Sequence, residues 1–261
     1  MDFNRIFDLL DNTVVMPVVE EGILDFVPSN CPHKKIGAAY DKASRKYDGY
    51  ITGENPLLKI LKKVALGLDK EAEIECTNII KKLLSQVKEG VILDIPAGTG
   101  LFTFEEYVRH PKITFIAAEY SWGMLRQARQ KVERLNAKNI LLVRADVGNL
   151  PFKNEIFDAV LCLNGIHSFP EKEKAISQMS RVLKKGKSIR GSLILRGERW
   201  LTDFVLETAY YRLRWFTRPA LTRQDFFAIL EKHGLRNVEH KLLKAALAFE
   251  AVKTAPTSDI S

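Results

Sequence analysis

The sequence predicts an α/β fold with a doubly wound, mostly parallel sheet, and three observations lead to this prediction. From Thr52 onwards, apolar segments of strand length alternate with segments whose apolar residues recur at helical spacing, which is typical of a parallel sheet with helices on both faces. The strand-like segment 91–95 runs into a tight turn that contains Gly98 and Gly100. Residues 157–163 are largely apolar, as expected of a central strand that is buried on both faces.

The first half of the chain predicts helices at 56–68 and 72–87, followed by an alternation of strands and helices. Asn55 can cap the first helix, and Pro56 stands in its opening turn, where a missing N–H has no consequence. The second helix carries apolar residues at helical spacing. The elements that follow are a strand at 91–95, a helix from about 99 to 109 that Pro111 ends, a strand at 114–118, a helix through 124–132 and a strand at 140–144.

The second half of the chain continues this alternation and then ends in two neighbouring strands. A basic turn that contains a glycine closes the next helix, and Gly234 ends the last one, as a glycine stop does. The final two strands are close enough in sequence to pair as an antiparallel hairpin. The expected elements are strands at 157–163 and 188–195 around a helix at 171–183, an aromatic excursion through 200–216, a helix at 226–233, strands at 238–243 and 246–252, and a disordered terminus at 254–261.

Composition and charge exclude several classes of protein. No uncharged apolar run reaches the roughly 18 residues of a membrane span, and no basic-then-apolar signal pattern begins the chain, so we expect a cytoplasmic protein without a transmembrane segment. The three cysteines are widely separated and predict neither a disulfide framework nor a metal site. Residues 170–261 hold 18 basic and 10 acidic side chains, so the whole net charge of +8 lies there. Such a segment faces nucleic acid, an anionic membrane surface or an anionic substrate, or is a solvated positive face.

The glycine turn at 97–100 indicates a cofactor site. Backbone N–H groups in such a turn lie close to a bound cofactor, and a dinucleotide fingerprint that starts at Gly98 would require a glycine at position 103. The chain has Thr103 there. Asp94 before the turn, the small residues within it, and Glu119 at the end of the next strand instead resemble the class I S-adenosylmethionine-dependent methyltransferases.

This resemblance implies a Rossmann-like, mostly parallel sheet of seven strands with an antiparallel last strand, helices on both faces and an N-terminal helical lid. We expect the lid at 1–55 and the methyltransferase domain at 56–253, with a substrate-pocket insertion at about 197–220. The resemblance extends to about residue 195. It is strongest to the group that includes the ubiquinone/menaquinone-biosynthesis methyltransferases and many small-molecule methyltransferases.

The resemblance also implies roles for the acidic residues at three successive strand ends. Asp94 would hold the methionine end of S-adenosylmethionine, and Glu119 would accept hydrogen bonds from both ribose hydroxyls. Asp146 would accept a hydrogen bond from the adenine amino group, with the backbone N–H of Val147 beside it. Each carboxylate could instead turn or cap its own loop. Pro96 departs from the family's usual glycine, because proline fixes φ and removes an N–H.

Further expected site residues lie at the fourth strand end and in the N-terminal segment. His167 follows the fourth strand and would act there as a general base, with packing or helix capping as the alternative; His33 is expected to be structural. Tyr40 belongs to a doubled Tyr-Asp element at 40–48 that resembles the family's lid, with amphipathic helix packing as the alternative. The expected cofactor-binding residues are Tyr40, Asp94, Pro96, Ala97, Gly98, Gly100, Glu119, Tyr120, Met124, Asp146, Val147, Leu163 and Asn164.

The sequence therefore predicts an enzyme that transfers a methyl group from S-adenosylmethionine to a small, aromatic or lipid-like organic molecule. The aromatic residues of segment 200–216 would line the substrate pocket with Phe169 at its rim, or would form an ordinary core. The basic last third leaves an RNA or protein methyltransferase as an alternative, so nucleic acid is the less favoured partner. Because Pro96 departs from the family's usual glycine, a noncatalytic S-adenosylmethionine-binding module is a further alternative. Thr103 disfavours an NAD-dependent oxidoreductase.

Overall fold

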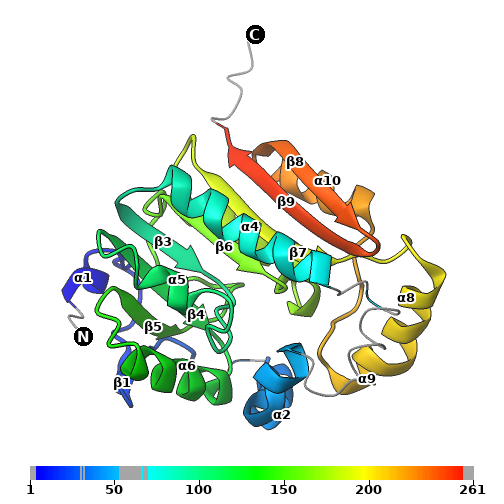
Figure 1. Ribbon diagram of the computed structural model, residues 1–261. Coiled ribbons are helices and arrows are strands. Elements are labelled where there is room, and N and C mark those ends of the chain that lie inside the picture. The colour runs from blue at the N-terminus through cyan, green and yellow to red at the C-terminus, as the bar shows by residue number, and fades with distance from the viewer. Residues whose placement is uncertain (1–3, 30, 32, 53–65, 67–69, 255–261) are drawn as a thin grey trace.

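The computed structural model describes residues 4–29, 31, 33–52, 66 and 70–254, and within them one sheet holds nine strands. The strands are β1 (Val18–Glu20), β2 (Ile23–Asp25), β3 (Gly90–Asp94), β4 (Ile113–Glu119), β5 (Ile140–Arg144), β6 (Ala159–Leu163), β7 (Ser188–Ile194), β8 (Leu235–Leu243) and β9 (Ala246–Lys253). Their spatial order is β1-β2-β5-β4-β3-β6-β7-β9-β8 (Figure 1).

The seven strands from β5 to β8 form the sheet that the resemblance implies. Strands β5, β4, β3, β6 and β7 pair in parallel, and β9 lies antiparallel between β7 and β8. In the parallel register, Asp94 lies opposite Ala117 and Leu161, while Glu119 lies opposite Arg144. The expected fold class is confirmed, and its parallel strands end at one edge of the sheet.

The N-terminal segment differs from the helical lid that the sequence predicts over residues 1–55. It contains a short helix, α1 (Asn4–Phe7), and the hairpin β1–β2 before the long helix α2 (Lys34–Thr52). Strand β2 adds to the sheet beside β5 through the pairs that begin at Leu24 and Val143, and Ile23 and Leu24 are fully buried. The hairpin was missed because strands of three residues are too short to show alternation.

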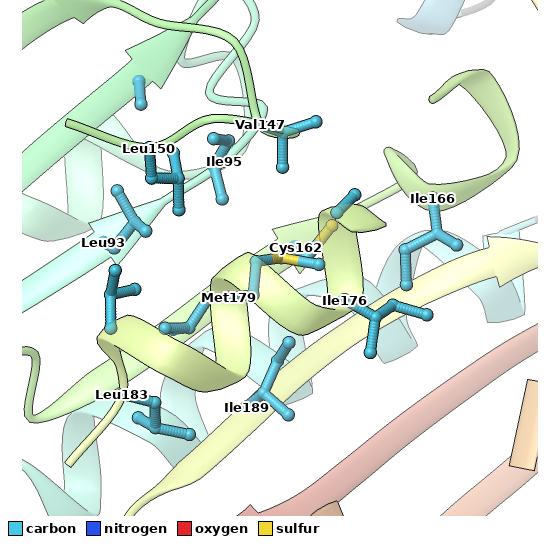
Figure 2. Packing of buried hydrophobic residues seen from close by; sticks show 14 of the residues in the cluster. Leu93, Ile95, Val147, Leu150, Cys162, Ile166, Ile176, Met179, Leu183 and Ile189 are labelled. Atoms are coloured by element: carbon cyan, nitrogen blue, oxygen red, sulfur yellow. The ribbon is translucent and has the colours of Figure 1, made fainter. Parts of the chain in front are cut away.

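Helices cover both faces of the sheet and bury the central strands between two apolar layers. Helices α4 (Lys70–Gln86), α5 (Phe104–Tyr107) and α6 (Trp122–Arg134) pack on one face, and α7 (Lys172–Val182) and α10 (Arg223–Lys232) pack on the other. Figure 2 shows Ile176 and Met179 of α7 over Cys162 and Ile189 of the central strands. Burial on both faces explains why β6 reads as a continuous apolar run.

Two expected elements differ in the structure, and a third lies almost entirely outside the described residues. The helix expected from about 99 to 109 is reduced to α5, because Gly98 and Gly100 adopt positive φ angles of 56° and 69°. The helix expected at 56–68 lies outside the described residues apart from Leu66, which is buried. The excursion forms one helical run, composed of α8 (Trp200–Val205), the π-helical turn η2 (Leu206–Tyr210) and α9 (Tyr211–Leu213). No helix in the described part of the chain is long and apolar enough to cross a membrane.

Candidate active site

A cavity lies at the edge of the sheet where β3, β4, β5 and β6 end, and the helix α2 contributes one of its walls. Ligands of open α/β sheets bind at this edge. The structure brings twelve expected residues to its lining: Tyr40, Asp94, Pro96, Ala97, Gly98, Glu119, Tyr120, Met124, Asp146, Val147, Leu163 and Asn164. Gly100 and His167 are not part of the lining.

The two glycines of the turn have different functions. Gly98 has open space beside it, since a Cβ placed there would meet no atom within 4 Å, and its N–H donates to Glu119 Oε2 at 3.1 Å. A Cβ on Gly100 would come to 2.4 Å from the Phe104 ring. Gly98 therefore leaves room for a ligand against the backbone, while Gly100 permits the turn to pack on α5.

Pro96 presents an apolar ring to the cavity. The ring packs against Gly165, where a Cβ would come to 2.1 Å from Pro96 Cδ. Pro96 has no N–H to offer, and the N–H of the next residue, Ala97, is already bonded to the carbonyl oxygen of Ala118 at 2.9 Å. Neither Pro96 nor Ala97 therefore offers a free N–H to a ligand in this part of the cavity.

Asp94 is a buried carboxylate at the end of β3. Its side chain is 1% exposed, and Oδ2 accepts a hydrogen bond from the Tyr107 hydroxyl at 3.0 Å. Burial raises the pKa of Asp94 to about 7, against the hydrogen bond from Tyr107, which favours the charged form. A ligand with an ammonium group would compensate the carboxylate charge, so the site suits the methionine end of S-adenosylmethionine.

Glu119 is held in one orientation by the backbone around it. Oε1 accepts from the N–H groups of Tyr120 at 2.8 Å and Ser121 at 2.9 Å, and Oε2 accepts from Gly98. Burial raises the pKa of this carboxyl, and the three backbone donors oppose that rise. A carboxylate oxygen can accept more than one hydrogen bond, so Glu119 can also receive two vicinal hydroxyl groups.

Asp146 turns its own loop and also meets the N-terminal segment. Oδ1 accepts from the N–H of Gly148 at 2.9 Å. Oδ2 lies 3.6 Å from Cys31 Sγ and 3.8 Å from His33 Nε2. His33 lines the cavity, although the sequence predicts only a structural role for it. Sequence reasoning missed it because His33 and Asp146 are 113 residues apart and no local pattern connects them.

The helix α2 is attached to the cavity through the first Tyr-Asp pair. Tyr40 and Tyr47 are seven positions apart, so they share a helix face, and both line the cavity with their ring centroids 6.4 Å apart. Asp41 Oδ1 accepts from Ser121 Oγ at 2.5 Å and from the N–H of Gly123 at 2.8 Å. This carboxylate therefore binds the N-terminus of α6, where negative charge is stabilising.

The second Tyr-Asp pair attaches α2 to the glycine turn. Asp48 Oδ1 accepts from the Thr99 hydroxyl at 2.5 Å, and Oδ2 lies 3.4 Å from Lys131 Nζ. In each pair the tyrosine lines the cavity while the aspartate binds the body of the domain. This arrangement explains why the Tyr-Asp element occurs twice at an interval of two helical turns.

The end of β6 adds Leu163 and Asn164 to the cavity wall. Asn164 adopts a φ of 52°, and its N–H donates to the Ser192 carbonyl oxygen at 2.9 Å and to Ser192 Oγ at 3.1 Å. Ser192 Oγ in turn donates to Asn164 Oδ1 at 3.0 Å. The strand β7 thus fixes the position of Asn164 at the end of the neighbouring strand.

His167 is not placed to act as the general base, and the expectation that it does so is corrected. Its ring is buried, stacks on Phe216 with the centroids 4.1 Å apart, and accepts from the N–H of Ile194 at Nδ1 over 3.2 Å. Burial, with Lys172 nearby, lowers its pKa to about 3. The ring is therefore a neutral packing group behind the cavity wall, which was the alternative reading of its position.

The aromatic residues of the excursion were expected to line the substrate pocket, but they do not line the cavity. Tyr210 and Phe216 are buried in a separate apolar cluster with Ile194 and Ala246, and Trp200 is 80% exposed. Phe169 does line the cavity, as expected. Most of these rings are core or surface because the excursion folds against β7 and β9 through its apolar face.

Comparison with known proteins agrees with this architecture. The family model described as a methyltransferase domain matches residues 92–186. An uncharacterized chloroplastic methyltransferase of Arabidopsis thaliana is 33% identical over 121 residues, which are 44% of this chain and 34% of that protein. A demethylmenaquinone methyltransferase of Bacteroides fragilis is 28% identical over 156 residues, which are 59% of this chain and 61% of that protein.

Among solved structures, a Thermotoga maritima S-adenosylmethionine-dependent methyltransferase, described as a possible histamine N-methyltransferase, has a TM-score of 0.58. It is 19% identical and covers 84% of this chain and 100% of its own. In fold, cavity and family match the chain resembles the class I S-adenosylmethionine-dependent methyltransferases, and the cofactor that this resemblance implies is S-adenosylmethionine. The aligned part of this chain spans between a third and two thirds of the curated relatives, so its particular reaction is a proposal.

Proposed function

We propose that the protein transfers the sulfonium methyl group of S-adenosylmethionine to a small organic molecule with an aromatic or lipid-like portion. The observation that carries this proposal is the apolar wall of the cavity beyond the cofactor carboxylates. Leu101, Phe102, Phe169 and Tyr47 all belong to this wall. A cavity with a few polar anchors at one end and apolar side chains at the other suits an amphipathic acceptor.

The cofactor end of the cavity would be divided among three carboxylates. Asp94 would hold the ammonium group and Glu119 the ribose hydroxyls, since the first is buried without a cationic partner among the described residues and the second is aimed by backbone donors. Asp146 and the N–H of Val147 would bind the adenine edge. The residues fit the cofactor, because Gly98 leaves open space between these groups.

S-adenosylmethionine, when bound, supplies an activated methyl group. The protein's share of catalysis is then to align the acceptor and to exclude water. The helix α2 would provide that exclusion, with Tyr40 and Tyr47 facing the cavity and Asp41 and Asp48 attached to the domain. This arrangement supports the division into a lid at 1–55, in which α2 is the element that covers the cavity, and a methyltransferase domain at 56–253.

We also propose a cytoplasmic location.

The acceptor class is supported by the demethylmenaquinone methyltransferase among the relatives, whose name specifies a quinone substrate. With His167 behind the wall, its imidazole would not take a proton from the acceptor in the cavity. A nucleic-acid or protein acceptor remains the second candidate, because the chain's net positive charge lies in its last third.

The test has two stages. Calorimetric titration with S-adenosylhomocysteine and NAD should give binding of the adenosyl ligand alone, and binding should be lost in Asp94→Ala and Glu119→Ala. Transfer of a labelled methyl group should then be measured to quinols, phenols, RNA and protein. Transfer to a quinol or phenol supports the proposal. Transfer to RNA or protein alone, or adenosyl-ligand binding without any transfer, refutes the small-molecule assignment.

A further inference from the structure

The exposed face of the α8–η2–α9 helix carries large apolar side chains that nothing in the described chain covers. Trp200 is 80% exposed and Phe204 is 59% exposed. Thr208 and Arg212 follow at intervals of four and are also exposed, so these side chains form one stripe along the helix. Leu213, at its end, is 53% exposed. The opposite face is anchored by Thr202, Leu206 and Tyr210, all buried.

The charges around this stripe are predominantly positive. Residues 196–223 hold six arginines and three acidic residues. The acidic residues are engaged: Glu198 pairs with Arg223, Glu207 pairs with Arg218, and Asp203 accepts from the N–H of Gly197.

Arg212 and Arg214 form no ion pair with a carboxylate among the described residues, whereas Arg218 and Arg223 are paired, and both are exposed. The surface therefore presents uncompensated positive charge at the C-terminal end of the apolar stripe. Arg212 lies within the stripe itself, next to Leu213.

We infer that this surface docks on an anionic phospholipid bilayer. A helix that lies on a membrane buries aromatic and aliphatic side chains in the headgroup region, while neighbouring arginines attract the anionic lipid surface. Trp200 and Phe204 are the side chains that would be buried, and Arg212 and Arg214 are the arginines that would attract the anionic lipids. A single-stranded nucleic acid would also meet aromatic and basic groups, but it gains nothing from the exposed aliphatic Leu213.

The position of the surface connects it to the cavity. The helices α8, α9 and α2 lie at the same end of the molecule (Figure 1). The segment that follows α9 touches the cavity wall from behind: the Tyr40 hydroxyl donates to the Trp215 carbonyl oxygen at 2.9 Å, and Thr217 Oγ1 donates to the Phe169 carbonyl oxygen. Docking would bring the cavity close to the bilayer. The inference deepens the proposed function and rests on it for the acceptor, but lipid binding itself requires no turnover.

The test is co-sedimentation of the full chain with vesicles of phosphatidylcholine alone or mixed with phosphatidylglycerol. We expect binding to the anionic vesicles, and a loss of at least tenfold in partitioning for W200A/F204A and for R212E/R214E. The matched controls remove exposed apolar groups elsewhere (V18A/I74A) and reverse exposed charges elsewhere (R134E/K138E), and they should bind as the wild type does. Affinity for S-adenosylhomocysteine should be the same in all five proteins, which shows that the variants are folded.

Absence of binding to anionic vesicles, or equal binding by the surface variants, overturns the inference. Arginine-dependent binding to single-stranded RNA without vesicle binding also overturns it and indicates a nucleic-acid surface. If the wild-type protein does not bind S-adenosylhomocysteine, the proposed function is refuted instead. Failure of the membrane inference and failure of the proposed function are therefore distinguishable.

Discussion

Replacing Asp94 by Asn should stabilise the free protein at high pH while it weakens cofactor binding. The Asp94 carboxyl is 1% exposed, and burial raises its pKa from 3.8 to about 7. The folded chain therefore binds more protons at this position than the unfolded chain between about pH 4 and pH 7. Stability falls as pH rises through this window, because the carboxylate must be charged inside the protein.

The magnitude follows from the size of the shift. A difference of about three pKa units corresponds to about 4 kcal/mol once the pH lies above 7. Asn is neutral at every pH and can still accept from the Tyr107 hydroxyl, so Asp94→Asn should lack this loss. The difference in unfolding free energy between variant and wild type should widen by about 2 kcal/mol from pH 5.5 to pH 8.

The assay is urea unfolding of both proteins at pH 5.5, 6.5 and 8, with calorimetric titration of S-adenosylhomocysteine alongside. The variant should bind the ligand at least tenfold more weakly, because a charge-assisted hydrogen bond to its ammonium group is lost. A stability difference that does not change with pH would show that Asp94 does not titrate in this window. Unchanged ligand affinity would remove Asp94 from the cofactor site.

Four further substitutions test other parts of the structure. Glu119→Gln should weaken S-adenosylhomocysteine binding tenfold or more, as measured by calorimetry. The reason is that one carboxylate acceptor becomes an N–H donor that faces backbone N–H groups. Unchanged binding would exclude the assignment of Glu119 to the ribose hydroxyls. Gly100→Ala should lower the unfolding free energy by 1 kcal/mol or more, measured by urea unfolding, because φ is 69° and the Cβ meets a ring; equal stability would contradict this packing. Asp48→Asn should leave global stability within about 1 kcal/mol but raise proteolysis of α2, and a wild-type cleavage pattern would argue against the attachment of the lid. His167→Phe should lower stability by about 1–3 kcal/mol, since the N–H of Ile194 loses its acceptor. The pH profile of methyl transfer should not change; loss of the acidic limb of that profile would restore His167 as a base.

Local pattern was sufficient for the central sheet and for the cofactor end of the cavity. Apolar runs such as 157–163, the glycine turn after β3, and the acids that follow successive strands are all read within a few residues of the chain. In a parallel sheet the strand ends share one edge, so three acids at successive strand ends converge whatever the details of packing. For this reason Asp94, Glu119 and Asp146 could be predicted from their positions alone.

Contacts between distant segments could not be predicted. His33 reaches the cavity because the hairpin β1–β2 pairs with β5 and directs the following chain over Asp146. Neither strand has the length to show alternation. The sequence pattern also placed His167 next to a strand end, but it could not predict which way the side chain points. The ring turns away from the cavity because the N–H of Ile194 donates a hydrogen bond to it and Phe216 stacks on it.

The sequence by itself determined the fold class and the place of the cavity, because strand length, glycine position and carboxylate spacing are local and follow from backbone geometry. Only the tertiary structure decided which of the remaining side chains face the cavity, which are core and which face solvent. The aromatic excursion is the clearest case: Trp200 and Tyr210 belong to the same helical run, yet one is 80% exposed and the other 6%. The difference depends on which face of the helix β7 and β9 cover, and that is fixed by packing between segments far apart in the chain.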